Sequence, residues 1–140
     1  MKSTLINLPD GREILRYTSK PFSTHTYIFK SKIGIWYLID PGVETDLILL
    51  DLAARGIHEI DRIICTHGHF DHIFGCYLAS NFFQVVPEIH SLEKKNINTI
   101  NFQLLICGTK EKYVPTLFNF IEISSINGRV LDSNLYRFSQ

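Results

Sequence analysis

The 140-residue chain lacks the features that mark several broad classes of protein. No apolar run approaches the ~18–20 residues of a membrane-spanning helix, and Pro9 and Gly11 interrupt the N-terminus before a signal-peptide core could form. The 14 basic and 14 acidic residues cancel, so the positive excess of a nucleic-acid-binding protein is also missing. We therefore expect a cytoplasmic protein with neither a membrane nor a nucleic acid as its partner, folded as one domain over residues 1–140.

Cysteine is scarce and its spacing is irregular. The three cysteines are Cys65, Cys76 and Cys107, and an odd number at such wide spacing argues against a disulfide framework. We expect them to be buried, reduced thiols in a cytosolic protein. The sequence also contains no internal repeat, low-complexity tract or linker.

What the sequence does contain is an alternation of short strand-like and helical segments. Turn residues and β-rich runs predict strands over residues 4–8, 12–17, 25–30, 33–39 and 62–66. Apolar spacing predicts helices over residues 46–55, 73–80 and 91–95, the first of them with Thr45 as N-cap and Gly56 as its stop. Later strands are predicted at residues 85–86, 102–107, 118–124 and 130–138, the last two joined by the turn signal Asn127-Gly128.

Residues 66–75 carry the clearest chemical signal. They place His67, His69, Asp71 and His72 within six positions, directly after a predicted strand. Imidazole and carboxylate are ligands for zinc and similar divalent ions. Residues two apart in an extended segment face the same way, so His67 and His69 can converge on one ion while Asp71 and His72 face a second. Gly68 is expected to allow an unusual backbone angle between these ligands.

This pattern resembles the His-x-His-x-Asp-His signature of the metallo-β-lactamase superfamily. Residues 26–29 and 36–42, which end in Ile39-Asp40-Pro41-Gly42, are similar to that family's opening hairpin and turn. The resemblance implies an α/β fold, the metallo-β-lactamase-like αβ/βα sandwich, present here as its N-terminal half with a shortened or incomplete second half. It also implies that Asp40 supports the ligand loop by orienting metal-bound histidines.

The same resemblance implies that the chain is a metal-dependent hydrolase. His67 and His69 would hold a first zinc ion and Asp71 and His72 a second, with manganese or iron as alternatives. A zinc-bound hydroxide would be the nucleophile, since zinc lowers the pKa of bound water to about 7, and Asp71 would act as a catalytic residue by orienting it. The histidine at position 69, Phe70 and zero net charge favour a small ester, thioester or lactone over the substrates of the iron-binding and nuclease branches.

The family's later ligands have no recognisable counterpart in this sequence. His90 and Asp132, the histidine and aspartate that follow the motif, are expected at the surface, as are His25 and His58. Three explanations stay open: a truncated or frameshifted gene, a partner chain that completes the fold, or a smaller core with an incomplete site. The alternative function is therefore a non-catalytic remnant or assembly subunit, and the apolar late strands predict a homodimer.

Overall fold

A computed structural model describes residues 1–122, and in this range seven strands form one mixed sheet in which strand order follows chain order. The strands are β1 (Lys2–Asn7), β2 (Glu13–Ser19), β3 (Thr24–Lys30), β4 (Trp36–Ile39), β5 (Arg62–Cys65), β6 (Glu88–His90) and β7 (Asn119–Ile121). Strands β1 to β4 pair antiparallel, whereas β4 to β7 pair parallel. The prediction of a mixed α/β fold is confirmed.

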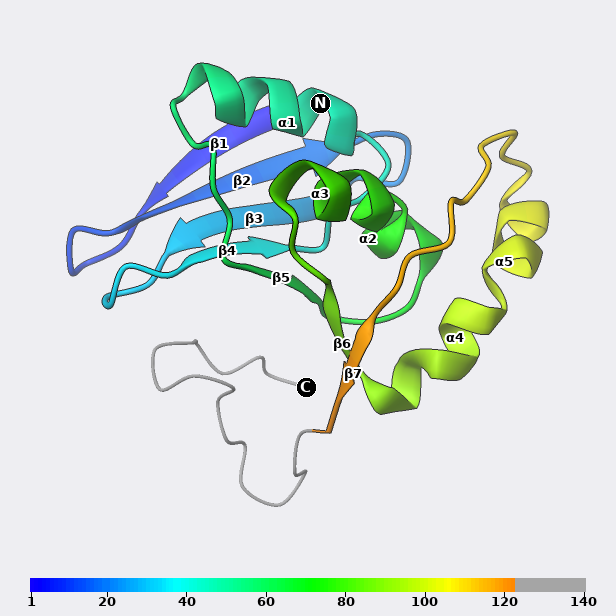
Figure 1. The fold of residues 1–140 in the computed structure, drawn as a ribbon. Helices are drawn as coiled ribbons and strands as arrows, with labels where there is room; N and C mark the ends of the chain where they lie inside the picture. The colour runs from blue at the N-terminus through cyan, green and yellow to red at the C-terminus, as the bar shows by residue number, and fades with distance from the viewer. Residues whose placement is uncertain (123–140) are drawn as a thin grey trace.

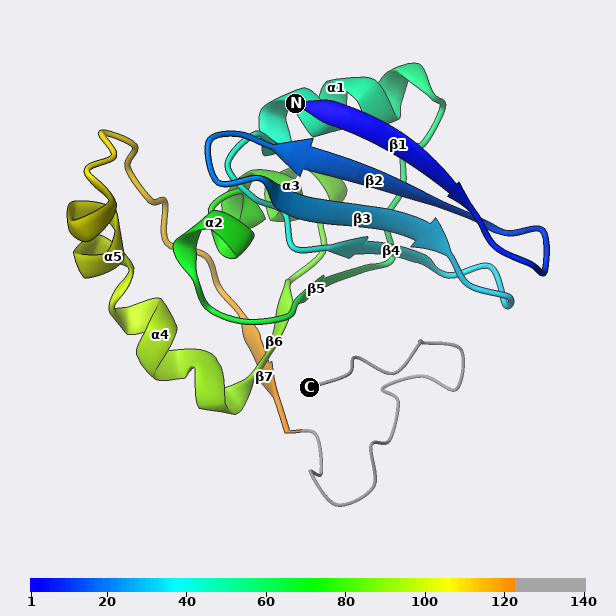
Figure 2. The same ribbon diagram turned by 180° about the vertical axis from the view of Figure 1, so that it is seen from behind.

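The helices lie between the parallel strands of the second half. They are α1 (Thr45–Ala54), α2 (Phe70–Ile73), α3 (Cys76–Phe83), the 3₁₀ turn η1 (Ser91–Glu93), α4 (Lys94–Asn98) and α5 (Ile100–Cys107). Figure 1 shows α1, α2 and α3 on one face of the sheet, with α4 and α5 beyond the end formed by β6 and β7. Figure 2 gives the view from behind, in which the first strands lie in front of these helices.

Turn chemistry fixes the first two hairpins, as predicted. In the β1–β2 turn, Gly11 adopts a φ of 84° and the Asp10 carboxylate accepts from the backbone N–H of Arg12 at 3.1 Å. In the β3–β4 turn, the backbone N–H of Gly34 donates to the carbonyl of Ser31 at 3.0 Å. Gly34 has a φ of 90°, a conformation that a residue with a Cβ adopts only with strain.

Helix α1 ends as predicted but begins one residue earlier. Gly56, at a φ of 79°, donates to the carbonyl of Ala53, and Ile57 donates to that of Leu52, which together form a Schellman motif. The N-cap residue is Glu44, so the prediction of Thr45 as N-cap is wrong. The Thr45 hydroxyl points back and donates to the carbonyl of Gly42 at 2.7 Å.

Two later predictions are wrong. Residues 85–86 are the connection out of α3, and the strand lies at Glu88–His90, beyond the proline that follows them. Residues 102–107 belong to helix α5. The helical signal was the spacing of Ile97, Ile100 and Leu104, all of which pack into one apolar cluster.

The predictions for residues 118–138 lie only partly within the residues that the structure describes. The strand predicted at residues 118–124 is present as β7 at Asn119–Ile121. The strand at 130–138, the turn at Asn127-Gly128 and Asp132 lie outside the described residues.

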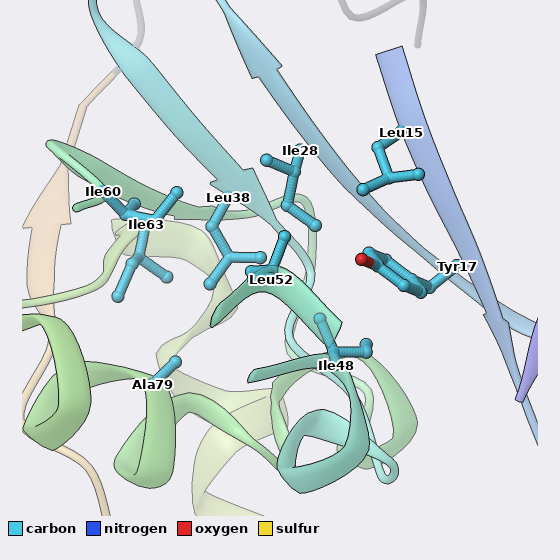
Figure 3. Close-up of a cluster of buried hydrophobic side chains, with 9 residues drawn as sticks. All are labelled: Leu15, Tyr17, Ile28, Leu38, Ile48, Leu52, Ile60, Ile63 and Ala79. Carbon is cyan, nitrogen blue, oxygen red and sulfur yellow. The ribbon is translucent and has the colours of Figure 1, made fainter. Parts of the chain in front are cut away.

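Two apolar clusters hold the helices against the sheet. Figure 3 shows the first, in which side chains from β2 to β5 meet α1 and α3: Leu15, Tyr17, Ile28, Leu38, Ile48, Leu52, Ile60, Ile63 and Ala79. The second cluster includes Phe70 and Ile73, the two buried residues of α2. Burial of each of these two side chains stabilises the fold by roughly 1.5–3 kcal/mol. Because both point inward, the residues between them, Asp71 and His72, are turned away from this cluster.

The cysteines are reduced, but only two are buried. Cys65 and Cys76 lie with their Sγ atoms 3.3 Å apart in the second cluster, whereas Cys107 is exposed, which corrects the expectation for that residue. Within residues 1–122 no helix has the length and apolar character required to cross a bilayer.

Candidate metal centre

The predicted ligands follow the carboxyl end of β5: His67 and His69 lie in the loop that leads into α2, and Asp71 and His72 lie in α2 itself. The neighbouring parallel strand β4 pairs Ile39 with Ile64 of β5, so Asp40 emerges at the same edge of the sheet. Carboxyl ends of adjacent parallel strands are the usual place for ligand sites in α/β layers. The sheet therefore brings Asp40 to the ligand motif.

Asp40 is buried, and its carboxylate joins the two ends of the motif. Oδ1 accepts from the backbone N–H of Thr66 at 2.7 Å, and Oδ2 accepts from the Thr66 hydroxyl at 2.6 Å. The same Oδ2 lies 2.9 Å from Nδ1 of His72. The backbone at Asp40 has a φ of 52°, a conformation that costs a non-glycine residue about 1–3 kcal/mol. Its backbone N–H donates to the carbonyl of Ile64, and its carbonyl accepts from the Thr26 hydroxyl.

These contacts determine which ring nitrogens carry protons. A carboxylate only accepts, so Nδ1 of His72 must donate to Asp40. The single proton of the Thr66 hydroxyl goes to Asp40, so Thr66 accepts from Nδ1 of His67, which lies 2.9 Å away. Both imidazoles are therefore protonated at Nδ1 and have Nε2 available to bind a cation.

The histidine rings form one group. The ring centroid of His67 lies 4.1 Å from that of His72 and 4.7 Å from that of His69. Burial lowers the pKa of His67, and the neighbouring His72 lowers it further, so the ring is neutral at pH 7. For His72, burial disfavours the charged form, but the hydrogen bond and negative charge of Asp40, aided by Asp71, outweigh it and raise the pKa.

Asp71 lies on the far side of His72. Its Oδ2 is 3.5 Å from Nε2 of His72 and accepts from the Thr24 hydroxyl at 2.6 Å. His69 is the exposed residue at the start of α2, and its carbonyl accepts from the backbone N–H of His72 at 3.0 Å. The four residues of the motif thus surround one region of the surface.

The side chains fit a divalent cation. Ligand atoms from Asp40, His67 and His72 lie within 4.8 Å of one another, and His69 and Asp71 adjoin this trio on its two sides. The donor set is imidazole and carboxylate, the ligands that zinc, manganese and iron share. Because Asp40 already binds Thr66 and His72, its geometry suits orienting a ligand, which is the role the sequence predicts.

Glycines allow the chain to pack tightly around this region. A Cβ on Gly42 would collide with the carbonyl of Asp71, and a Cβ on Gly75 would collide with the side chain of Thr45. Gly75 instead donates its N–H to the carbonyl of Pro41 at 2.9 Å. Gly68 has no positive φ, so the expected unusual angle is absent there. Its missing side chain makes room for Asn96, whose Cβ would be 2.9 Å from an added Cβ.

Sequence reasoning missed the threonines of the site. Thr66 binds Asp40 through its hydroxyl and its backbone N–H, and Thr24 binds Asp71 through its hydroxyl. Thr66 could have been noted because it begins the motif, but no local signal connects Thr24 with Asp71. The remaining histidines of the described chain lie elsewhere: His25 contacts Thr18, His90 accepts from the N–H of Leu92, and His58 is exposed.

Comparison with known proteins agrees with this arrangement. Residues 19–102 match the sequence profile of the Metallo-beta-lactamase superfamily. The chain is 35% identical over 86 residues to the Probable metallo-hydrolase MJ0888 of Methanocaldococcus jannaschii, a match that covers 60% of this chain and 41% of that protein.

Two solved structures show the same fold. One is TTHA1623 in a di-iron-bound form, with a TM-score of 0.68 and 22% identity over 76% of this chain and 53% of that one. The other is the BLEG-1 B3 metallo-beta-lactamase, with a TM-score of 0.65 and 18% identity over 77% of this chain and 52% of that one. The chain spans about half the length of these proteins, which confirms the prediction of an incomplete sandwich.

Proposed function

Because this chain belongs to the metallo-β-lactamase superfamily, we propose that it forms the metal-binding half of a metal-dependent hydrolase. The observation that carries this proposal is the Asp40 network. Its hydrogen bonds select the tautomer of His67 and His72 that has the proton on Nδ1, which leaves Nε2 of each ring available. A loop that only needed stability would not require two half-buried imidazoles in the same tautomer at one edge of the sheet.

Each residue of the motif has a distinct role in this proposal. His67 and His69 hold one ion, Asp71 and His72 hold a second, and Asp40 orients the rings of His67 and His72. Thr24 fixes the Asp71 carboxylate by donating to Oδ2, which leaves Oδ1 for the cation or for orienting water. Zinc is the ion we expect. Manganese and iron remain alternatives, and a relative of this fold was solved with two irons.

The substrate we propose is a small ester, thioester or lactone. Bound divalent ions supply acidity to water and polarise a carbonyl group. The exposed His69 and the half-buried Asp71 leave the site open to a small molecule. The chain's zero net charge gives it no general attraction for polyanions.

Metal content is the direct test of this proposal. The chain, purified and dialysed against zinc, manganese or iron(II), should retain at least one equivalent, and His67→Ala should lose most of it. The matched control is His58→Ala, which removes an exposed histidine that precedes β5, at the opposite end of that strand from the motif. Retention below about 0.2 equivalents, unchanged by His67→Ala, would overturn the proposal, since specific protein sites bind these ions tightly.

A second candidate is a non-catalytic subunit or remnant with the same site. It is favoured by the ligand count, because the described residues offer two predicted ligands per ion where zinc sites ordinarily have three or four. A partner chain or a second copy would then supply the rest. Hydrolysis of a simple thioester or lactone by the zinc-loaded chain, lost in His69→Ala, excludes this candidate. Tight zinc binding without hydrolysis supports it.

A further inference from the structure

The ligand loop is held on a second side by the segment that follows β6. Figure 2 shows α5 lying next to α2, although β6 separates them in the sequence. This segment runs from η1 through α5, and it contacts the loop through hydrogen bonds of Glu93 and Gln103 and through Asn96, which packs against Gly68. None of these residues belongs to the His-x-His-x-Asp-His motif.

Gln103 brackets His69 through the backbone. Its Oε1 accepts from the N–H of Phe70 at 2.8 Å, and its Nε2 lies 3.4 Å from the carbonyl of Gly68. One amide group therefore binds the residues before and after His69. The same Nε2 donates to the carbonyl of Asn96 at 2.9 Å and lies 3.3 Å from the Thr99 hydroxyl, so the amide itself is held in place.

Glu93 binds the peptide between the two first histidines. Its Oε2 accepts from the N–H of Gly68 at 2.8 Å and from the side-chain amide of Asn96 at 2.6 Å. With Gln103, this fixes three backbone groups on the two sides of His69: the N–H and carbonyl of Gly68 and the N–H of Phe70. The His67–His69 segment thus has its spacing set from outside the loop.

The close approach of this segment depends on Gly68. An added Cβ would lie 2.9 Å from Asn96 Cβ and 3.2 Å from the carbonyl oxygen of Glu93. Contacts this short leave no room for a Cβ at position 68. The glycine in the loop therefore allows the helical segment to follow its observed path. The contact is a built feature of the site and involves backbone groups that would otherwise bind water.

We propose that Glu93 and Gln103 are positioning residues that hold the His67–His69 backbone in its metal-binding conformation. We call this pair the helical clamp. The inference rests on the proposed metal binding. The inference extends the proposed metal binding because it assigns the spacing of the first two ligands to residues outside the motif. A loop fixed before the ion arrives loses less conformational freedom on binding, so the clamp raises affinity.

The first measurement uses the metal-free chain. Amide hydrogen exchange of Gly68 and Phe70, followed by NMR, should be slow in the unaltered chain. It should become faster at Phe70 in Gln103→Met and at Gly68 in Glu93→Leu. Glu93→Gln retains an oxygen that can accept from Gly68 and should restore slow exchange. The matched control is Gln84→Met, which removes a glutamine hydrogen bond to Asn81 at the end of α3.

The second measurement is Zn²⁺ affinity, with the visible spectrum of Co²⁺ as a probe of ligand geometry. Gln103→Met and Glu93→Leu should each weaken Zn²⁺ binding by about 10-fold and change the Co²⁺ spectrum, while Glu93→Gln and Gln84→Met leave both unchanged. Unchanged affinity and spectrum in the first two variants, or unchanged exchange, would overturn the clamp. Failure of the unaltered chain to bind Zn²⁺ would instead overturn the proposed function.

Discussion

The ligand loop is supported on two sides, and the two supports differ in what they hold. On the sheet side, the buried carboxylate of Asp40 binds two side chains, the Thr66 hydroxyl and the ring of His72, in addition to the backbone N–H of Thr66. On the helical side, half-buried Glu93 and Gln103 bind only the backbone of the loop and their own segment. The sheet side therefore sets tautomer and ring direction, whereas the helical side sets the spacing between ligands.

Burial also makes the two supports unequal in energy. Asp40 itself is buried, so if its carboxylate is removed water cannot easily take its place beside the Thr66 hydroxyl and Nδ1 of His72, and each group left unsatisfied there costs about 1–3 kcal/mol. If Glu93 or Gln103 is replaced, water can take over some of the hydrogen bonds that the loop backbone loses, because both side chains are partly exposed. The following predictions test this ranking.

The largest effect is expected for Asp40→Asn. Asparagine tolerates the positive φ of position 40, but its amide group cannot accept from all three donors. We expect a loss of about 2–4 kcal/mol of unfolding free energy, measured in urea, and a 10–100-fold loss of Zn²⁺ affinity. Asp46→Asn, an exposed residue in the first turn of α1, is the control and should change neither. Equal results for the two variants would contradict the role of Asp40.

The next effect is expected for Gly68→Ala, which separates the clamp from the loop. The added Cβ would press on Asn96, and the strain should cost about 1–3 kcal/mol together with weaker Zn²⁺ binding. Gly108→Ala is the comparison: its Cβ meets nothing within 4 Å, but its φ of 65° is unfavourable for alanine. That variant should lose stability and keep its Zn²⁺ affinity. If both variants bind Zn²⁺ normally, the spacing of the loop does not depend on the helical side.

A smaller effect is expected for Thr24→Val, which removes one hydroxyl of nearly the same shape. Asp71 loses the hydrogen bond from Thr24, and we expect about 1–1.5 kcal/mol of lost stability. In calorimetric titration, the weaker of two Zn²⁺ equivalents should be affected more than the tighter one. Thr18→Val, which removes a hydroxyl contact with His25, serves as the reference variant. A greater loss of the tighter equivalent would contradict this expectation, and a uniform loss of both would show that Thr24 supports the whole loop.

The smallest effect is expected for Asp51→Asn, at a carboxylate far from the loop in the sequence. Hydrogen bonds from Tyr17 and Arg55 lower the pKa of Asp51 below its ordinary value of 3.8. Its contribution to stability is therefore present above that value and is lost as the pH falls through the lowered pKa. We expect less than about 1 kcal/mol at pH 7, a difference that shrinks as the pH falls below 3.8, and unchanged Zn²⁺ affinity. A clear loss of Zn²⁺ binding would show that any acceptor on this face matters to the site.

The sequence predicted the first half of the fold well because its signals are local. Glycine turns and alternating side chains specify β1 to β4, and Gly56 ends α1 where expected. In the second half, the apolar stretch around Phe102 was predicted as a strand. The buried positions Ile97, Ile100 and Leu104 have helical spacing, and packing against α2 and β6 selected the helix.

For the site, the sequence predicted the ligands but not their supports. The motif itself is contiguous, and Asp40 was predicted from a family resemblance. Thr24, Glu93 and Gln103 reach the motif from 25 to 47 positions away through one or two hydrogen bonds each. Such contacts depend on the path of the chain in space, and a threonine or glutamine carries no mark of them in the sequence. The assignments of His67, His69, Asp71 and His72 as ligands stay predictions until metal binding is measured.

The order of the strands in the sheet has a consequence for how the protein is made. Each strand after β1 pairs with the one synthesised just before it, so no pairing has to wait for a strand from much later in the chain. As the chain leaves the ribosome, β1 to β4 can form a template before the histidine motif emerges. We expect the loop to meet Asp40 first and the helical segment last. Nascent-chain folding assays with chains stalled after β5 and after α5 would resolve these two steps.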